Sequence, residues 1–184
     1  MHLKNSNLFI MSGGPGGGKT TPLLELEKLG VAHVPEVARQ IIQEQVQTGG
    51  NALPWADRQR YTELMLERSI ESFHENTPAA KPLLADRGIP DTLGYARLIG
   101  LPETAWIEAA CRQYRYAPVV FLAPPWMEIY ETDGERKQDF AEAERTYDVV
   151  KDVYRDCGYE TIVLPKVAPP ERARFILEQL RLAT

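Results

Sequence analysis

A glycine-rich stretch at residues 13–20, GGPGGGKT, constrains the fold of this 184-residue chain more than any other feature. An apolar run at residues 7–11 precedes it, and a segment with a broad apolar face, residues 19–29, follows it. The stretch matches the pattern G-x-x-x-x-G-K-[ST], whose glycines allow successive backbone N–H groups to turn toward phosphate oxygens. The sequence therefore predicts a phosphate-binding loop between a buried strand and a helix.

The chemistry of this loop predicts that its ligand is a nucleoside triphosphate. The helix that follows adds N–H groups without intrahelical partners and the positive end of its dipole. Lys19 can reach the β- and γ-phosphates, and the Thr20 hydroxyl can ligate Mg²⁺. The G-x-G-x-x-G fingerprint fits no register of the loop, which argues against a nicotinamide or flavin oxidoreductase. We expect ATP, with GTP as the alternative, to be held by Gly13, Gly14, Pro15, Gly16, Gly17, Gly18, Lys19, Thr20 and Thr21.

Apolar segments alternate with helical patterns along the rest of the chain. Strands are predicted at residues 7–11, 31–35, 81–86, 117–123 and 159–165, and helices at residues 19–29, 36–46, 55–75, 90–99, 103–114, 138–157 and 171–182. Pro22 falls at the edge of the first helix's first turn, where a missing N–H costs little. Strands that are almost wholly apolar and alternate with helices predict a parallel sheet covered on both faces. We therefore expect one α/β domain that spans residues 1–184.

Composition excludes several classes of function. The net charge of −5 offers no basic stripe for duplex nucleic acid. Cys111 and Cys157 have no metal-site spacing, so we expect two buried, reduced thiols and a cytoplasmic location. No apolar run is long enough for a signal peptide or a membrane span.

Charged residues follow two of the predicted strands, at the edge of the sheet where ligands bind in α/β folds. Asp86 ends the apolar run PLLAD, where an acid in a phosphate-binding fold can face Mg²⁺, and Arg87 could contact a phosphate or an acceptor. Glu36 follows the second strand, and Arg39 lies on the same helix face. Glu36 is either a helix-capping acid or a carboxylate that accepts a proton from an acceptor hydroxyl, with Arg39 nearby for anionic groups.

The stretch at about residues 124–139 turns polar and charged. It is either a solvated loop or a lid that brings an arginine onto the transferring phosphate, with Arg136 as the first candidate and Arg145 as the second. Trp55 and Trp126 lie beside prolines near predicted loops, and we expect both to pack in the core rather than to stack on a base.

The segments GGPGGGKTT, PEVAR, LLADRGIPDTLGY and PPW…DGER occur in this order in a group of AAA-type P-loop ATPase domains. The chain resembles this group, which is related to small-molecule kinases and includes the ribosylnicotinamide kinase half of a bacterial NAD-biosynthesis regulator. The resemblance implies a three-layer fold with a five-stranded parallel sheet in the order 2-3-1-4-5. It also implies roles for four residues: Glu36 as base or substrate ligand, Asp86 as magnesium or acceptor-site acid, Arg87 as a phosphate or acceptor contact, and Arg136 as lid arginine. Pro22 and the Asp-Arg-Gly segment depart from the pattern of that kinase.

Two functions remain open from the sequence. The first is an ATP- and Mg²⁺-dependent kinase for a nucleoside, nucleotide or similar acceptor, in which Lys19 and the loop hold the phosphates, Thr20 and Asp86 hold Mg²⁺, and Glu36 or Asp86 orients the acceptor hydroxyl. The second is an ATP-hydrolysing regulatory switch that binds a protein partner. The sequence indicates neither the acceptor nor the oligomeric state.

Overall fold

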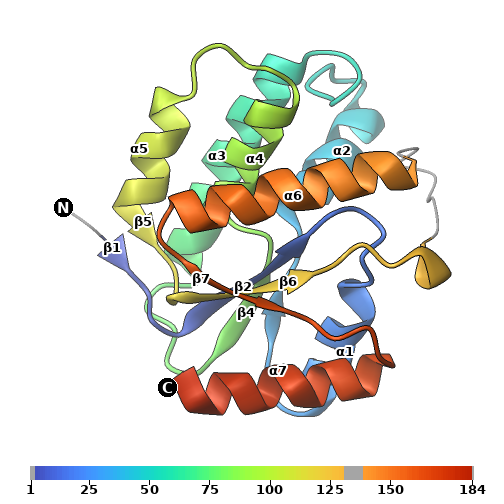
Figure 1. Ribbon diagram of the computed structural model, residues 1–184. Helices are drawn as coiled ribbons and strands as arrows, with labels where there is room; N and C mark the ends of the chain where they lie inside the picture. The colour runs from blue at the N-terminus through green and yellow to red at the C-terminus, as the bar shows by residue number, and fades with distance from the viewer. Residues whose placement is uncertain (1–2, 131–138, 184) are drawn as a thin grey trace.

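The computed structural model describes residues 3–130 and 139–183. A parallel five-stranded sheet lies at its centre, in the order β3-β4-β2-β6-β7 (Figure 1). Numbered along the chain within this sheet, the order is 2-3-1-4-5, as the resemblance implied. The strands are β2 (Leu8–Gly13), β3 (His33–Val34), β4 (Leu83–Asp86), β6 (Val119–Ala123) and β7 (Glu160–Val163).

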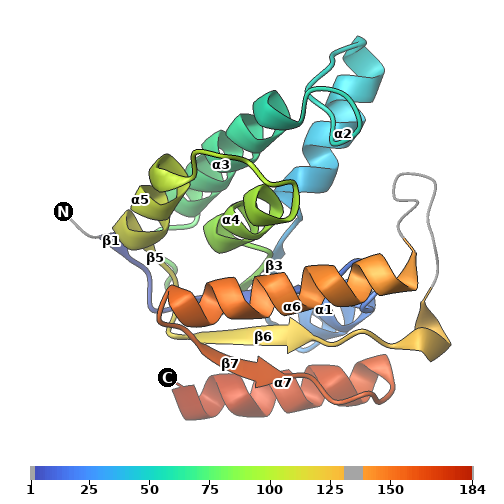
Figure 2. The ribbon, with the colours of Figure 1, turned by 45° about the horizontal axis from the view of Figure 1, so that its top comes forward.

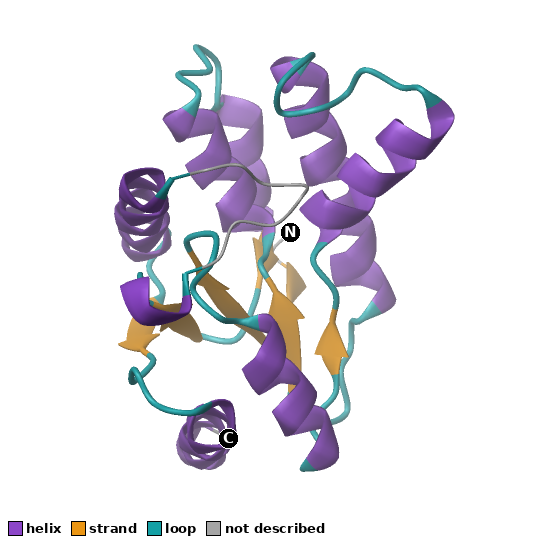
Figure 3. Cartoon of the chain, turned by 90° about the vertical axis from the view of Figure 1, so that its right-hand side faces the viewer, coloured by secondary structure: helices purple, strands orange, loops and turns teal. Residues whose placement is uncertain are grey.

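Seven α-helices in the described residues cover the two faces of the sheet (Figure 2). On one face lie α1 (Thr20–Lys28) and α7 (Pro169–Ala183). The other face carries α2 (Val37–Thr48), α3 (Arg58–Glu75), α4 (Ile89–Leu98), α5 (Ala105–Gln113) and α6 (Phe140–Asp156). Seen from the side in Figure 3, the strands lie between these two helix layers, which gives the three-layer α/β fold that the sequence predicts.

The central strand β2 shows why its sequence is apolar at every position. Its six residues are all buried, because successive side chains point to opposite faces and both faces are covered. Phe9 and Met11 belong to the core beneath α1 and α7, whereas Leu8 and Ile10 belong to the core beneath α3 to α6. The sheet therefore separates two hydrophobic cores.

The structure adds three short elements that the sequence does not predict. β1 (Leu3–Lys4) pairs in parallel with β5 (Tyr114–Arg115) outside the main sheet, and the 3₁₀ helix η1 (Met127–Ile129) follows β6. Elements of two or three residues are too short to show a period in the sequence.

Helix α1 accommodates Pro22 as expected. Its first intrahelical hydrogen bond runs from the Leu23 N–H to the Lys19 carbonyl, so Pro22 precedes every residue that must donate in this helix. Cys111 is a buried free thiol and Cys157 a half-buried one. None of the described helices is long and apolar enough to cross a membrane.

Candidate functional site

The phosphate-binding loop joins the carboxyl end of β2 to the start of α1. Because every pair of strands in the main sheet is parallel, β3, β4 and β6 end at the same edge. Ligands bind at this edge in open α/β sheets. The fold therefore brings the loop beside the polar residues that follow β3 and β4.

Two glycines of the loop have backbone conformations that residues with a side chain seldom adopt. Gly13 has φ of 137°, and a Cβ there would lie 2.3 Å from the Ala123 carbonyl oxygen. Gly18 has φ of 69°, and a Cβ there would lie 2.6 Å from Ile129 Cδ1. Positive φ favours glycine at both positions, and at Gly13 the close approach to backbone atoms of Ala123 adds a second requirement. The first and last glycines of the motif therefore set the shape of the loop.

Lys19 and Asp86 lie near one another at the carboxyl end of the sheet, close enough to interact electrostatically. Lys19 is buried and immediately precedes α1, and Asp86 ends β4 opposite Met11. Burial raises the pKa of the Asp86 carboxyl above its usual value, and the nearby Lys19 ammonium offsets this only in part. Asp86 Oδ1 is buried and has no hydrogen-bond partner among the described residues.

The residues at this edge fit a magnesium ion. A buried carboxylate oxygen without a partner needs a donor or a cation, and Mg²⁺ binds through one or two protein oxygens plus phosphates. Asp86 and Thr20, the exposed first residue of α1, would supply the protein oxygens that hold this ion. Among the described residues, no group of three or more His, Cys, Asp or Glu side chains is arranged to hold a metal ion, so a cation here would depend on the nucleotide's own oxygens.

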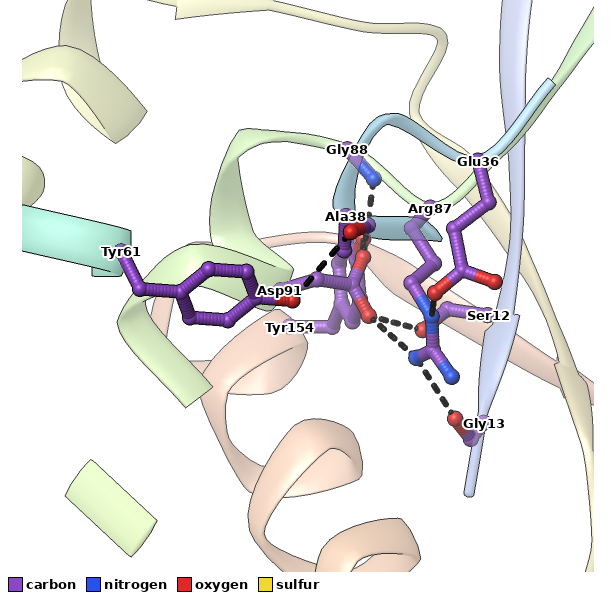
Figure 4. A network of polar contacts seen from close by, with 9 residues as sticks. All are labelled: Ser12, Gly13, Glu36, Ala38, Tyr61, Arg87, Gly88, Asp91 and Tyr154. Carbon is purple, nitrogen blue, oxygen red and sulfur yellow. Dashed lines mark hydrogen bonds and ion pairs between the residues drawn. The ribbon is translucent and has the colours of Figure 1, made fainter. Parts of the chain in front are cut away.

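Arg87 stands at the centre of a buried network of charges (Figure 4). Its Nε donates to Glu36 Oε1 at 2.9 Å, and its Nη1 donates to the Gly13 carbonyl at 2.8 Å and to Asp91 Oδ1 at 3.2 Å. Burial disfavours the charge on Arg87, but the surrounding carboxylates outweigh this and raise its pKa. Arg87 thereby links the end of β3, the end of β2 and the start of α4.

The backbone of Arg87 takes a conformation that non-glycine residues seldom adopt. Its φ of 73° lies in the left-handed region, which costs about 1 kcal/mol for a residue with a Cβ. Its N–H donates to the Met11 carbonyl at 2.9 Å, which extends the sheet pairing by one residue. The turn directs the guanidinium back over the end of β2, toward Glu36 and Gly13.

Asp91 accepts from four donors in this network. They are the Ser12 hydroxyl, Arg87 Nη1, the Gly88 N–H and the Tyr154 hydroxyl, which come from β2, from the turn before α4, and from α6. Four donors occupy the lone pairs of a carboxylate. Asp91 therefore orders the site and has little capacity left to accept a substrate proton.

A pocket of about 270 Å³ opens beside the loop, between α2, α3, α4 and α6. Its walls are mostly apolar and aromatic, with Ile42, Pro54, Trp55, Tyr61, Met65, Tyr95, Leu98 and Val150 among them. Its polar residues are Glu36, Arg87, Asp91, Glu142 and Thr146, and Pro15 of the loop also lines it. A concave, mostly apolar pocket with a few converging polar groups is typical of a small-molecule site.

Residues 8–172 of the chain match the family model of an AAA domain. The chain belongs to this AAA domain family. A search of curated protein sequences finds no significant match.

Solved structures of small-molecule kinases share the fold of this AAA domain. A NadR protein in complex with NR has a TM-score of 0.71 at 17% identity, over 95% of this chain and 51% of that one. Deoxyadenosine kinase from M. mycoides has a TM-score of 0.67 at 13% identity, over 98% of this chain and 100% of that one. Shikimate kinase from Acinetobacter baumannii, in complex with shikimate, has a TM-score of 0.56 at 21% identity, over 96% and 93%. The AAA domain therefore has a P-loop kinase fold.

The structure corrects the expectation for Trp55. This side chain does not pack in the core: it is 58% exposed and lines the pocket of the AAA domain. Trp126 is half-buried and lies against the guanidinium of Arg172. A tryptophan next to a proline is equally compatible with a wall and with a core, so the sequence offers no signal that separates them.

The remaining candidate residues are placed as follows. Glu36 and Arg87 line the pocket together, whereas Arg39 is half-buried in the first turn of α2 and is absent from the described lining. Arg145 is exposed on α6. Arg136 lies outside the described residues, so its role as a lid arginine stays a prediction.

The sequence did not predict three residues of this hydrogen-bond network: Ser12, Asp91 and Tyr154. Asp91 lies within the segment DRGIPD, and an acid three residues after a glycine at a helix start is a capping signal. Tyr154 belongs to the apolar stripe of α6, and nothing in the sequence distinguishes it from any other core tyrosine.

Proposed function

We propose that this AAA domain is an ATP- and Mg²⁺-dependent phosphotransferase that acts on a hydroxyl group of a small acceptor. The observation that carries the proposal is the pocket, which opens directly beside the phosphate-binding loop and is lined by Pro15 of that loop. An ATP-hydrolysing switch has water as its acceptor and needs no such pocket. The kinase reading therefore accounts for a feature that the switch leaves unexplained.

The loop would hold the donor nucleotide in this proposal. Backbone N–H groups of residues 13–19 cradle the phosphates, and the Lys19 ammonium neutralises charge on the phosphoryl group. Thr20 and Asp86 would hold Mg²⁺, which bridges phosphate oxygens and stabilises their charge. The unpartnered Oδ1 of Asp86 supports this assignment, because a buried carboxylate oxygen requires a partner.

Glu36 is the better candidate for orienting the acceptor hydroxyl. It lines the pocket, whereas Asp86 is absent from the described lining. Its Oε1 accepts a hydrogen bond from Arg87 Nε at 2.9 Å, which fixes the Glu36 side chain at the N-terminus of α2. A carboxylate held within reach of a hydroxyl can accept its proton during transfer. We therefore assign Glu36 to the acceptor and Asp86 to the metal.

The charges of the pocket favour an acceptor without a phosphate or carboxylate group. The described lining holds three carboxylates, Glu36, Asp91 and Glu142, against the single guanidinium of Arg87. Arg87 already pairs with Glu36 and Asp91. An anionic acceptor would meet net repulsion here, whereas a neutral or cationic ring would not.

The aromatic walls favour a flat ring in the acceptor. Tyr61 and Tyr95 meet edge to face, with ring centroids 5.3 Å apart, and Trp55 exposes its ring nearby. The Tyr95 hydroxyl is buried in this wall without a hydrogen-bond partner among the described residues. A polar group on the acceptor would supply that partner. A nucleoside-like acceptor combines these features.

The proposal is tested by ADP release with a panel of acceptors. The panel contains neutral nucleosides, cationic ring nucleosides, nucleoside monophosphates and shikimate, each with ATP and Mg²⁺. We expect stimulation by an uncharged or cationic nucleoside and none by the anionic compounds. ADP release that no acceptor stimulates would favour the switch, in particular if it depended on a protein partner.

Lys19→Ala is the matching variant. Because Lys19 provides the charge at the transferring phosphate, we expect turnover to fall by at least about 10³-fold, with the fold intact by circular dichroism. Lys28→Ala, on the exposed end of the same helix, serves as the control and should keep full activity. Unchanged phosphotransfer in Lys19→Ala would overturn the mechanism.

A further inference from the structure

Arg172 is a fully buried cation behind the phosphate-binding loop. It lies in the first turn of α7, on the face of the sheet opposite the pocket, and is 1% exposed. No carboxylate among the described residues pairs with it. Burial without a counter-ion lowers the pKa of Arg172 and costs free energy. A residue retained at this cost calls for a physical reason.

Its hydrogen bonds go to backbone carbonyls instead. Nη1 donates to the Gly17 carbonyl at 3.0 Å and, at 3.4 Å, to the Gly18 carbonyl. Nε donates to the Pro165 carbonyl at 2.7 Å, in the segment between β7 and α7. The guanidinium carbon lies 4.8 Å from the centre of the Trp126 ring. Arg172 thus binds the backbone of the loop at Gly17 and Gly18, the last two glycines before Lys19.

The geometry of the peptide bond carries the effect of these hydrogen bonds to the other side of the loop. In a trans peptide the carbonyl of one residue and the N–H of the next point in opposite directions. A Gly17 carbonyl turned toward Arg172 therefore turns the Gly18 N–H away from it, and the Gly18 carbonyl does the same for the Lys19 N–H. A cation that donates to a carbonyl also polarises the peptide group and strengthens its N–H as a donor.

We propose that Arg172 is a positioning residue for the nucleotide phosphates, which acts through the peptide groups that join Gly17, Gly18 and Lys19. It holds and polarises the N–H groups of Gly18 and Lys19, which then donate to phosphate oxygens. The inference rests on the proposed function, namely that the loop binds a nucleoside triphosphate. This role also explains why Arg172 has no carboxylate partner. The phosphates would lie on the other side of the Gly17–Gly18 and Gly18–Lys19 peptide groups and supply the negative charge from there.

The first test compares Arg172→Lys and Arg172→Met with a matched pair on the same helix, Arg174→Lys and Arg174→Met. Arg174 is exposed on the same helix, so its variants repeat the same two substitutions, one that keeps the charge and one that removes it, at a solvent-exposed position. Titration calorimetry with Mg·ATP should show at least a tenfold loss of affinity for both Arg172 variants and less than a twofold change for both Arg174 variants. Urea unfolding of each protein establishes that it is folded at the titration temperature.

Arg172→Lys keeps the test decisive if Arg172→Met does not fold. It retains the buried charge but cannot span the Pro165 and Gly17 carbonyls as a planar guanidinium does. Wild-type affinity in folded Arg172→Lys would overturn the inference. A wild-type protein that fails to bind Mg·ATP would instead overturn the proposed function, and the inference with it.

A spectroscopic readout separates positioning from a general structural role. With wild-type protein saturated by Mg·ATP, we expect the amide protons of Gly18 and Lys19 to shift downfield as they donate to phosphate. In Arg172→Lys at saturating Mg·ATP, these two shifts should shrink while that of the Thr20 amide changes less. Identical Gly18 and Lys19 shifts in the two saturated proteins would show that Arg172 does not orient them.

Discussion

At the residue scale, the site depends on how each buried charge is matched. Arg87 faces two carboxylates and a carbonyl, and Asp91 faces four donors, so neither is left uncompensated. Asp86 differs, because its Oδ1 has no partner among the described residues and burial raises its pKa. The contrast separates charged groups whose partners the structure supplies from a carboxylate oxygen to which the proposed function assigns a magnesium ion.

Asp91→Asn tests the architectural role. An amide nitrogen in place of one oxygen would face a donor, and Arg87 would lose a buried partner, so we expect the free energy of unfolding to fall by about 3 kcal/mol. Asp156→Asn is the control, because Asp156 forms a 2.8 Å pair with Arg97 in which both side chains are well exposed. Its removal should cost less than about 1 kcal/mol in urea unfolding. Equal losses would contradict the role of Asp91.

At the scale of elements, two connecting segments shape the candidate site: the loop between β2 and α1, and the connection between α2 and α3. The loop after β2 passes close to the end of the neighbouring strand β6, where Gly13 pairs with Ala123. The connection between α2 and α3 carries Pro54 and Trp55 into the pocket wall. The first segment requires a fixed backbone, whereas the second contributes side chains to the pocket wall.

Gly13→Ala tests the requirement for a fixed backbone. The added Cβ would meet the Ala123 carbonyl at 2.3 Å and force φ of 137° on a non-glycine residue. We expect a loss of about 2–4 kcal/mol in the free energy of unfolding, together with loss of Mg·ATP binding. Gly30→Ala is matched to it, since Gly30 has φ of 86° with nothing within 4 Å, and should cost about 1 kcal/mol. If the two variants unfold alike, close packing is not the reason for Gly13.

Trp55→Ala tests the pocket wall. Because Trp55 is 58% exposed, its removal should change the free energy of unfolding by less than about 1 kcal/mol. Loss of ring contact should raise the KM for the acceptor about tenfold and leave the KM for ATP unchanged. Trp106→Ala on α5, 38% exposed, should alter neither constant. An unchanged acceptor KM in Trp55→Ala would remove this residue from the site.

At the scale of the whole molecule, buried tyrosines join the site to the core. Tyr154 donates to Asp91, and Tyr159 accepts from the Tyr116 N–H and meets the Tyr154 ring edge to face at 5.7 Å. All three lie in the core between the sheet and α3 to α6. Burial raises the pKa of each, that of Tyr159 to about 12.

This cluster predicts how stability responds to alkali. The unfolded chain releases a tyrosine proton near pH 10, whereas the folded protein retains it until about pH 12 at Tyr159. The folded state binds more protons in this window, so stability falls as pH rises, by up to about 1.4 kcal/mol per pH unit for each tyrosine. Tyr159→Phe should make the decline between pH 10 and 12 shallower by one such increment in urea unfolding. Parallel profiles would show that Tyr159 does not contribute.

Local patterns were sufficient for much of this molecule. The loop is recognisable because its glycines, lysine and threonine follow one another at fixed spacing, and the two central strands β2 and β6 are apolar runs whose residues are all buried. The placement of Pro22 followed from the absence of intrahelical partners in a first turn. These features depend on neighbours along the chain, and the residues therefore determine them directly.

Contacts between distant segments were decided only by the tertiary structure. Asp91 meets Ser12 across 79 positions, and Arg172 reaches Gly17 across 155. The sequence placed Glu36 and Arg87 at one edge of the sheet, but only the fold shows that they pair. Trp55 became part of a wall because α2 and α3 leave it exposed beside the pocket. The sequence by itself thus determined the phosphate-binding loop and the sheet, because both depend on the spacing of residues that are close together along the chain. The pocket beside the loop and the contacts of Arg172 with the loop depend on packing, because their residues come from segments that meet in space and not along the chain.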